Sequence, residues 1–425
     1  MIQSSMNKMS DKPLRILMPS YRSHPFTGGQ GIYMRLVTKA MVELGHTVEV
    51  ISGQPYPILD EGVKLTKLPS LDLYSYDSPL KAFKFKLLKE PINLYEWLSH
   101  LSGGFSEPYT FGERMAVWGK KNYNRFDVVH DNQTLAYGLI KLRDMGVPVV
   151  GTIHHPITMD KRIDIKHAET LSLKLLKWRW YSFLKMQIKV ARQLDPIIVV
   201  SENTRKDVVK DFKIDPKKTR KVLHGIDHKT FEPIPSIKRK KNQLITTASA
   251  DVPLKGLIYL IRAYSDLLND FPDLSLIVIG KLRDGPTSKE LDKKGIKDKV
   301  KFISDLTSRQ IAELYAESTI AVSPSVYEGF GFPAGEAMSC GIPLISTNGG
   351  SLPEVVGESG IIVPHSNPDE LQKAIKELLL SPEKREELGE KGRNRVLEKF
   401  TWKRAAKELV DVYREAISNA DNRSR

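Results

Sequence analysis

The feature that most constrains this chain is the repeated pairing of a short, continuously apolar strand with an amphipathic helix. Near the start, residues 14–20 predict a buried strand, residues 32–44 a helix and residues 47–52 a second strand. Gly45 follows the helix where a C-cap glycine is common. Strand, helix and strand in this order form a βαβ unit, so the chain is predicted to build a parallel sheet.

The same pattern recurs along most of the chain. Further strands rich in valine and isoleucine are predicted at 127–130, 148–153, 196–201, 244–248, 275–279, 300–303, 320–323, 343–346 and 360–363. Helices are predicted between them, including 257–268 and 309–316, and residues 368–417 are predicted to be helical throughout. Continuous apolar strands need helices on both faces of the sheet. The predicted fold class is therefore α/β, with two Rossmann-like, doubly wound parallel-sheet domains.

The boundary between the two domains is predicted where this alternation stops. Residues 231–242 contain two prolines and a basic run, which is typical of a linker. Residues 13–230 then form the N-terminal domain and residues 243–400 the C-terminal domain. Residues 401–425 are expected to form a helix that packs back on the N-terminal domain. The polar residues 1–12 have no apolar stretch of a signal peptide and are expected to be a disordered tail.

Composition excludes several classes of protein. The one cysteine, Cys340, rules out a disulfide framework and a cysteine-rich zinc site. The sequence has no run of about 18 apolar residues, so no membrane-spanning helix is predicted. A single thiol and the lack of a signal peptide favour a cytoplasmic protein. The net charge of +14 favours an anionic partner, which could be phosphate-bearing substrates, nucleic acid or an acidic membrane surface.

The segment Glu328–Pro343 contains the strongest functional pattern. Glu328 and Glu336 are separated by seven residues, with glycines between them, and follow a predicted strand. Glycines leave backbone N–H groups uncovered, and the start of a helix near Pro333 attracts anions. The two carboxylates are therefore placed to accept hydrogen bonds from different parts of one anionic, polyhydroxy ligand. The alternative explanation is a tight glycine loop with a capping glutamate.

This segment resembles glycosyltransferase family 4, the group 1 glycosyltransferases, which are retaining enzymes of the GT-B fold. The family pattern is Glu, seven residues, Glu, with Gly-Phe-Gly in the middle, as in Glu328–Glu336. The resemblance covers most of the chain and is weakest between about residues 55 and 123. The other matching segments are 27–31, 201–208, 224–227, 254–256 and 400–413.

The resemblance implies a cleft between the two domains that binds a nucleoside diphosphate sugar, with a UDP- or GDP-sugar on the C-terminal domain and the acceptor on the N-terminal domain. Glu336 would accept hydrogen bonds from the ribose hydroxyls, and Glu328 would hold hydroxyls of the transferred sugar. Lys255 would neutralise the leaving diphosphate, where charge develops in the transition state. Backbone amides of the donor loop would contact the sugar or the diphosphate, namely those of Gly329, Phe330, Gly331 and Phe332.

Ser249 departs from the family pattern. The family usually has an arginine six residues before the lysine, and Ser249 stands at that position here. Because arginine is not interchangeable even with lysine at a phosphate, a serine leaves one cation missing from the diphosphate site. Lys281 and Arg283, which follow a predicted strand, are candidates to supply it. For Lys255 itself, the alternative explanation is a solvated surface lysine.

Two further sites are implied on the N-terminal domain. In the family, the glycine loop after the first strand, here Gly28, Gly29 and Gly31, faces the diphosphate and the acceptor. The loop is too long for a dinucleotide-binding fingerprint, and no acidic residue ends the second strand. His154 ends another strand, and the resemblance implies that it contacts the transferred sugar, with His155 as its neighbour. A glycine turn and a structural histidine are the alternative explanations.

Residues 170–192 combine lysines on one helical face with leucine, tryptophan and phenylalanine elsewhere, and residues 81–89 are similar. Such a helix either lies on an anionic membrane surface or packs its apolar side on the sheet. In the first case the protein is peripheral on the inner face of the membrane and the acceptor is lipid-linked. The acceptor classes that stay open are a glycan, a lipid-linked molecule and a small molecule.

The predicted catalytic residues are Glu328, His154 and Lys255. The sequence has no Asp-x-Asp motif and no metal-ligand spacing, so neither a metal nor another cofactor is predicted. Other enzymes of the same fold, a phosphorylase or a sugar-nucleotide epimerase, are the first alternative. A non-catalytic nucleic-acid-binding protein is the second, but no binding motif supports it and no nucleic acid partner is predicted. Retention by front-face attack and retention through a covalent intermediate both stay open.

Overall fold

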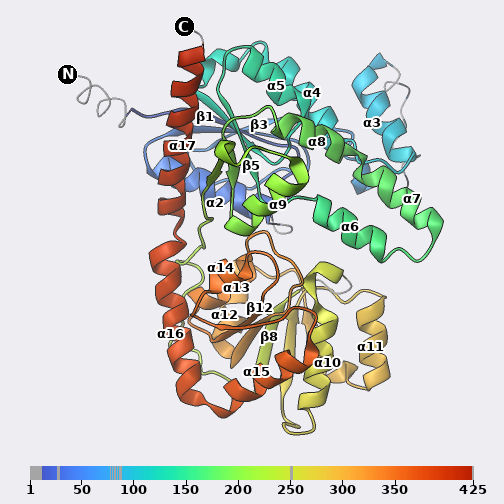
Figure 1. Ribbon diagram of the computed structural model, residues 1–425, viewed down its shortest axis with the longest axis vertical. Helices are drawn as coiled ribbons and strands as arrows, with labels where there is room; N and C mark the ends of the chain where they lie inside the picture. Colours follow the sequence, from blue (N-terminus) through green and yellow to red (C-terminus); the bar gives the residue numbers. More distant parts are fainter. Residues whose placement is uncertain are drawn as a thin grey trace. The chain divides into compact units, whose positions relative to one another are not determined.

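The computed structural model describes residues 12–25, 29–76, 78, 80, 83, 85, 89–248 and 252–423. The chain divides into two compact α/β units, each built on one parallel sheet (Figure 1). The first unit comprises the chain up to Val200, then Thr204–Val222, and the chain from Ala405 onward. The second unit comprises Ser201–Asn203 and Leu223–Arg404. The prediction of two doubly wound parallel-sheet domains is confirmed.

The first unit contains a seven-stranded sheet in the order β3-β2-β1-β4-β5-β6-β7, with parallel neighbours. Its strands are β1 Arg15–Ser20, β2 Thr47–Ser52, β3 Lys64–Lys67, β4 Val128–Asn132, β5 Val149–Ile153, β6 Ile197–Val199 and β7 Thr219–Lys221. The sequence pattern did not predict β3 and β7. Both are edge strands with lysines, and an edge strand needs no continuous apolar run.

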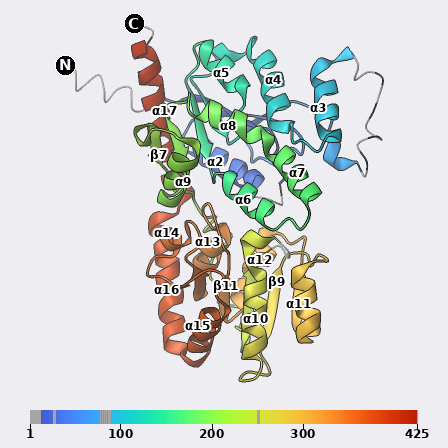
Figure 2. The same cartoon turned by 45° about the vertical axis from the view of Figure 1, so that its right-hand side comes forward.

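The first unit also contains helices, several of which pack on this sheet. They are α2 Gln30–Glu43, α3 Pro91–Leu101, α4 Glu107–Gly119, α5 Tyr137–Asp144, α6 Thr158–Lys166, α7 Leu171–Trp180, α8 Leu184–Ala191, α9 Glu202–Phe212 and α17 Trp402–Arg423. Figure 2 shows α4, α5 and α8 together, and their buried side chains Met115, Leu139 and Val190 share one core with the strands. Tyr413 of α17 is fully buried, and its hydroxyl lies 2.5 Å from Nδ1 of His130 in β4. The last helix is therefore an integral part of the first unit.

The second unit contains a six-stranded sheet in the order β10-β9-β8-β11-β12-β13, again parallel. Its strands are β8 Gln243–Thr247, β9 Ser275–Ile279, β10 Val300–Ile303, β11 Ile320–Ser323, β12 Leu344–Thr347 and β13 Ile361–Val363. In both sheets the strand order reverses beside the first strand, at β1–β4 and at β8–β11. Ligands of open α/β sheets bind beyond the carboxyl ends of the strands at this switch point.

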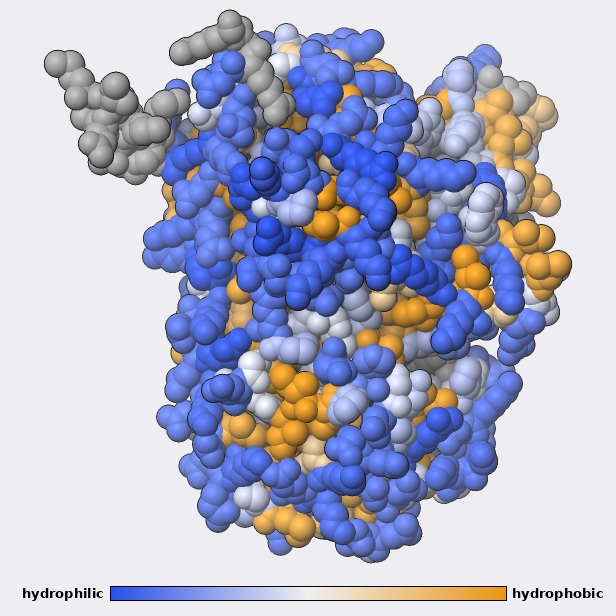
Figure 3. Space-filling model, in the orientation of Figure 1, coloured by the Kyte–Doolittle hydropathy of each residue, from blue (hydrophilic) through white to orange (hydrophobic). Residues whose placement is uncertain are grey.

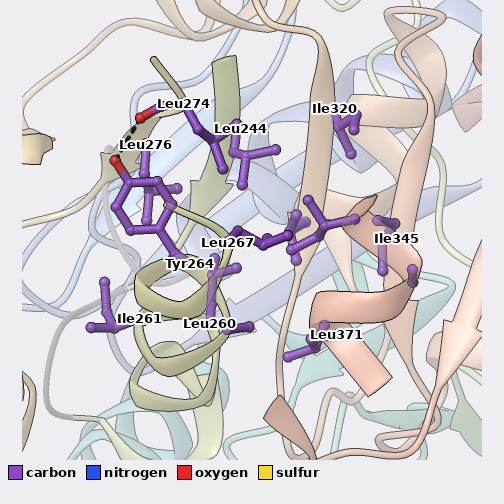
Figure 4. Close-up of a cluster of buried hydrophobic side chains, with 14 of the residues drawn as sticks. Leu244, Leu260, Ile261, Tyr264, Leu267, Leu274, Leu276, Ile320, Ile345 and Leu371 are labelled. Atoms are coloured by element: carbon purple, nitrogen blue, oxygen red, sulfur yellow. Dashed lines mark hydrogen bonds between the residues drawn. The ribbon is translucent and has the colours of Figure 1, made fainter. Parts of the chain in front are cut away.

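The helices of the second unit are α10 Leu257–Leu267, α11 Pro286–Lys294, α12 Ser308–Glu317, α13 Phe332–Ser339, α14 Leu352–Val356, α15 Pro368–Leu380 and α16 Pro382–Lys399. Figure 4 shows the core in which α10 and α15 pack against the strands, with Leu260 and Leu371 among the buried side chains. Tyr264 fits into this core because its hydroxyl donates a hydrogen bond to the Leu274 carbonyl at 2.9 Å. The core thus holds the strands from which the site loops leave.

The prediction of one helical stretch over residues 368–417 is wrong in detail. The stretch is divided into α15, α16 and the start of α17. The first break falls at Ser381, because the following Pro382 disfavours helical backbone at the residue before it. The second break falls at Phe400, whose carbonyl accepts a hydrogen bond from the Ile226 amide at 2.7 Å.

The segment 231–242 was predicted to be a linker, and the structure places it within the second unit instead. Phe231 is buried, and the Arg239 guanidinium donates hydrogen bonds to the carbonyls of Ser318 and Gly341. One residue of the basic run, Arg239, therefore donates hydrogen bonds to backbone carbonyls of the second unit. Apart from Ser201–Asn203, the chain enters the second unit at Leu223 and returns to the first unit at Ala405.

Among the described residues, no helix combines the length and the apolar character that crossing a membrane requires.

Candidate functional site

Three loops meet at the switch point of the second sheet. They leave the carboxyl ends of the adjacent strands β8, β11 and β12. Backbone hydrogen bonds join them: the Val326 amide donates to the Leu254 carbonyl at 2.8 Å, and the Ser351 amide donates to the Glu328 carbonyl at 2.9 Å. The loop that contains Glu328 is therefore held between its two neighbours.

Glycines allow this close approach of backbone to backbone. Gly350 has a φ of 64°, and a Cβ atom placed on it would lie 2.2 Å from the Glu328 carbonyl oxygen. Gly256 has a φ of 62°, and its Cβ would lie 2.1 Å from the Pro324 carbonyl oxygen. At both positions a side chain is disfavoured by the positive φ, and the neighbouring backbone also leaves no room for a Cβ atom. Sequence reasoning did not single out Gly350 as a site residue, although the adjacent glycines at 349 and 350 were a visible turn signal.

Glu328 and Lys255 form an ion pair in this loop cluster. The Lys255 Nζ lies 2.6 Å from the Glu328 Oε1, and the Ser325 hydroxyl donates to the same oxygen at 2.8 Å. The side chains of Glu328 and Lys255 are 14% and 32% exposed, so the pair is reachable from solvent. The structure thus brings together two predicted site residues that lie far apart in the sequence. It also adds Ser325, which sequence reasoning missed.

The loop that contains Glu328, predicted to bind the donor and called the donor loop below, ends at the start of α13. Gly331 is the N-cap residue with a φ of 100°, and Pro333 occupies the first turn. The rings of Phe330 and Phe332 lie 5.1 and 5.4 Å from the imidazole of His224. These ring contacts hold the loop in place. The aromatic side chains therefore have a structural role, in addition to the ligand contacts predicted for the backbone amides. The contacts of the amides of Gly329 to Phe332 with a ligand stay a prediction.

Glu336 lies on α13, and most of its surface is buried. Burial, and secondarily the negative charge of Asp227, raises the pKa of Glu336 to about 7. Among the described residues, none donates a hydrogen bond to its carboxylate. A carboxyl group in this state gains from a ligand that brings hydroxyl donors.

His154 follows β5 on the first unit. Its Nε2 lies 2.6 Å from the Asn132 Oδ1, and its ring packs edge-on against Tyr33 at 4.7 Å. Burial lowers the pKa of His154 to about 3, so the imidazole is neutral and donates from Nε2 to the amide oxygen. Sequence reasoning missed Asn132, which ends the neighbouring strand β4 and fixes the orientation of this ring.

The glycine loop of the first unit is also tightly packed. Gly29 has a φ of 69°, and a Cβ on Gly31 would lie 2.1 Å from the His24 carbonyl oxygen. Gly28 and Ser249, two further predicted site residues, lie outside the described residues. Lys281 and Arg283 are exposed in the loop after β9, next to β8 in the sheet. Across the described part of the chain, no three potential metal-binding side chains gather into a cluster.

Two parallel-sheet α/β domains of this topology define the GT-B fold, and solved structures agree. Sucrose-phosphate synthase from Thermosynechococcus elongatus is similar over 96% of this chain and 100% of its own, with a TM-score of 0.72 and 20% sequence identity. HepE from Anabaena, solved in complex with UDP-glucose, is similar over the same shares with a TM-score of 0.66 and 14% identity. The predicted fold class is confirmed.

Family comparisons narrow this class. Residues 27–230 match the family model described as Glycosyltransferase Family 4, and residues 229–395 match that described as Glycosyl transferases group 1. An MMP alpha-(1->4)-mannosyltransferase from Mycolicibacterium hassiacum is 42% identical over 410 residues, which cover 95% of this chain and 99% of that protein. The chain belongs to the group 1, family 4 glycosyltransferases, as the resemblance implied, and is a glycosyltransferase.

Proposed function

We propose that this chain transfers a sugar from a nucleoside diphosphate sugar to a hydroxyl group of an acceptor, with retention of configuration at the anomeric carbon. The observation that carries the proposal is the loop cluster of the second unit. It holds the Lys255–Glu328 ion pair, and Glu336 lies on α13, the helix that follows the Glu328 loop, as a carboxyl group without a described hydrogen-bond donor. The cation and the glycine-rich start of α13 suit the diphosphate. The two carboxylates suit the hydroxyls of the sugar and of the ribose.

Each side chain has a separate task in this proposal. Lys255 binds the diphosphate and stabilises the charge that grows on the leaving oxygen. Its ammonium group has three donors, so it can keep the contact with Glu328 while it binds phosphate oxygens. Glu328 orients the transferred sugar, and Glu336 accepts hydrogen bonds from the ribose. No metal takes part in this scheme.

The first unit is proposed to serve the acceptor and the transferred sugar. The neutral His154 would bind a sugar hydroxyl, and Gly29 and Gly31 would let the backbone approach the ligand. The 42% identical relative is named as an alpha-(1->4)-mannosyltransferase, which supports mannose as the first sugar to test and a glycan as the first acceptor. The donor base is proposed to be uracil or guanine.

A donor screen tests the proposal. UDP-, GDP- and ADP-sugars are compared by thermal shift and by sugar transfer, with and without EDTA. We expect one donor to stabilise the wild-type protein and EDTA to have no effect. Glu336→Ala should remove the stabilisation, whereas Glu313→Ala, on an exposed face of α12, should retain it. A wild-type protein that no donor stabilises would refute the proposed function.

The raised pKa of Glu336 predicts how donor affinity depends on pH. Because the pKa is about 7, the carboxyl is protonated below that pH, and only above it does it offer the ribose hydroxyls two charged acceptor oxygens. The affinity for a nucleoside diphosphate sugar should therefore rise between pH 6 and 8, by up to about tenfold per pH unit below the pKa. Calorimetric titration over this range measures it. Glu336→Gln does not titrate and should give a flat profile, and an identical slope in that variant would contradict the assignment.

A further inference from the structure

The helical stretch 170–192 divides into two parts with opposite environments. In α8, the side chains of Leu184, Met186 and Val190 are buried in the core of the first unit. In α7, no residue is buried, and Leu171 and Leu175 are 74% and 63% exposed. Packing on the sheet therefore explains the apolar residues of α8 but leaves those of α7 unexplained.

Helix α3 also has exposed apolar residues, namely Tyr95, Leu98 and Leu101. The two helices are joined by Arg179, whose guanidinium donates hydrogen bonds to the hydroxyls of Ser99 and Ser102. Figure 3 shows hydrophobic surface gathered over both helices, at the right of the view. We call this surface the apolar patch, and it consists of Tyr95, Leu98, Leu101, Leu171, Leu173, Leu175, Leu176 and Trp178. Large apolar side chains exposed on two neighbouring helices indicate an interaction site.

Positive charges outnumber negative ones around α7, although the acidic Glu169 precedes this helix and is exposed. Residues 170–192 include six lysines and arginines and no acidic residue. The Nζ atoms of Lys161 and Lys185 lie 5.7 and 5.5 Å from the centre of the Trp178 ring, which is 54% exposed. These three side chains and Tyr181 line part of a cavity of about 120 Å³. Lys177 is paired with Asp164 at 3.0 Å, so Lys161, Lys174 and Lys185 supply the positive charge.

We propose that the apolar patch docks on an anionic lipid surface. The leucines of α7 and α3 enter the boundary of the acyl chains, Trp178 lies at the level of the headgroups, and the lysines bind lipid phosphates. A second copy of this chain is a poorer occupant, because it would bring two basic surfaces together. The proposal concerns where the protein works and does not depend on the transfer reaction.

Vesicle sedimentation of the full chain tests the proposal. Vesicles of phosphatidylcholine alone are compared with vesicles that contain about a third phosphatidylglycerol. We expect binding to the anionic vesicles to exceed binding to the neutral ones at least tenfold, and to fall as salt is added. Leu175→Asp should lower binding to anionic vesicles at least tenfold, because it places a charge in the patch. The double variant Lys161→Gln/Lys185→Gln should reduce the preference for anionic vesicles.

Leu380→Asp is the matched control, because Leu380 is 65% exposed at the end of α15 in the second unit, close to the 63% of Leu175. It should bind vesicles like the wild type. Equal wild-type binding to both kinds of vesicle overturns the proposal, and so does an equal loss in both leucine variants. Sedimentation equilibrium without lipid identifies the competing occupant: a dimer that Leu175→Asp dissociates would mean that the patch binds a second copy.

Discussion

Replacing Glu328 with glutamine is expected to lower kcat for sugar transfer about a hundred- to thousand-fold, while the donor KM changes little. The estimate is the usual loss when one preorganised polar contact to the reacting group is removed. Glutamine keeps the shape and one acceptor oxygen, but loses the charge that pairs with Lys255 at 2.6 Å. Steady-state kinetics with the donor found in the screen measures both constants. A KM effect alone would mean that Glu328 contributes only to binding.

Lys255→Ala and the double variant Lys255→Ala/Glu328→Gln complete the test. Because the two side chains form one ion pair, their effects on kcat should be strongly non-additive. Ser325→Ala removes the second donor to Glu328 Oε1 and should lower kcat only about tenfold, since it orients the carboxylate without contacting the sugar. Additive losses for Lys255 and Glu328 would show that the ion pair does not act as a unit in the reaction.

The second large effect is expected from Gly350→Ala. The new Cβ would lie 2.2 Å from the Glu328 carbonyl oxygen, so the donor loop must shift. We expect transfer to fall at least a hundredfold, because a misplacement of about 1 Å at a reacting group costs that much. The unfolding free energy should also fall by about 1–2 kcal/mol for the left-handed backbone and by about 1–3 kcal/mol more for the clash.

Gly295→Ala separates these two causes. Gly295 follows α11 with a φ of 65°, nearly the 64° of Gly350, but a Cβ there has no neighbour within 4 Å. It should therefore cost only the backbone term and leave transfer unchanged. Urea denaturation gives the stabilities, and a transfer assay on the folded fraction gives the activities. If both variants lose the same stability and activity, the contact between Gly350 and Glu328 is not what positions the donor loop.

The sequence pattern predicted the central strands of both sheets because they are buried on both faces and therefore continuously apolar. It failed at the two edges of the first sheet, where β3 and β7 carry lysines. It also failed at residues 231–242, where the composition resembled a linker. Arg239 explains the second failure. The Arg239 guanidinium donates hydrogen bonds to the carbonyls of Ser318 and Gly341. The sequence alone does not distinguish such an arginine from one that is solvated.

The candidate site was predicted residue by residue but not as an arrangement. The spacing of Glu328 and Glu336 and the family likeness identified both carboxylates. The ion pair between Lys255 and Glu328 spans 73 positions, and only the adjacency of β8 and β11 brings it about. The contact of His154 with Asn132 likewise depends on the neighbouring strands β4 and β5. Such pairings follow from sheet order, which local patterns do not specify.

The position of α17 has a consequence for how the chain is made. The ribosome completes all of the second unit before Tyr413, which belongs to the core of the first unit, is synthesised. Until then, His130 in the centre of the first sheet lacks the hydroxyl that it contacts in the finished protein. The nascent N-terminal unit must therefore wait, incomplete, while about half of the chain is translated and folds. A product truncated shortly after Arg404 would lose part of the first unit's core, even though it contains every residue of the predicted donor site.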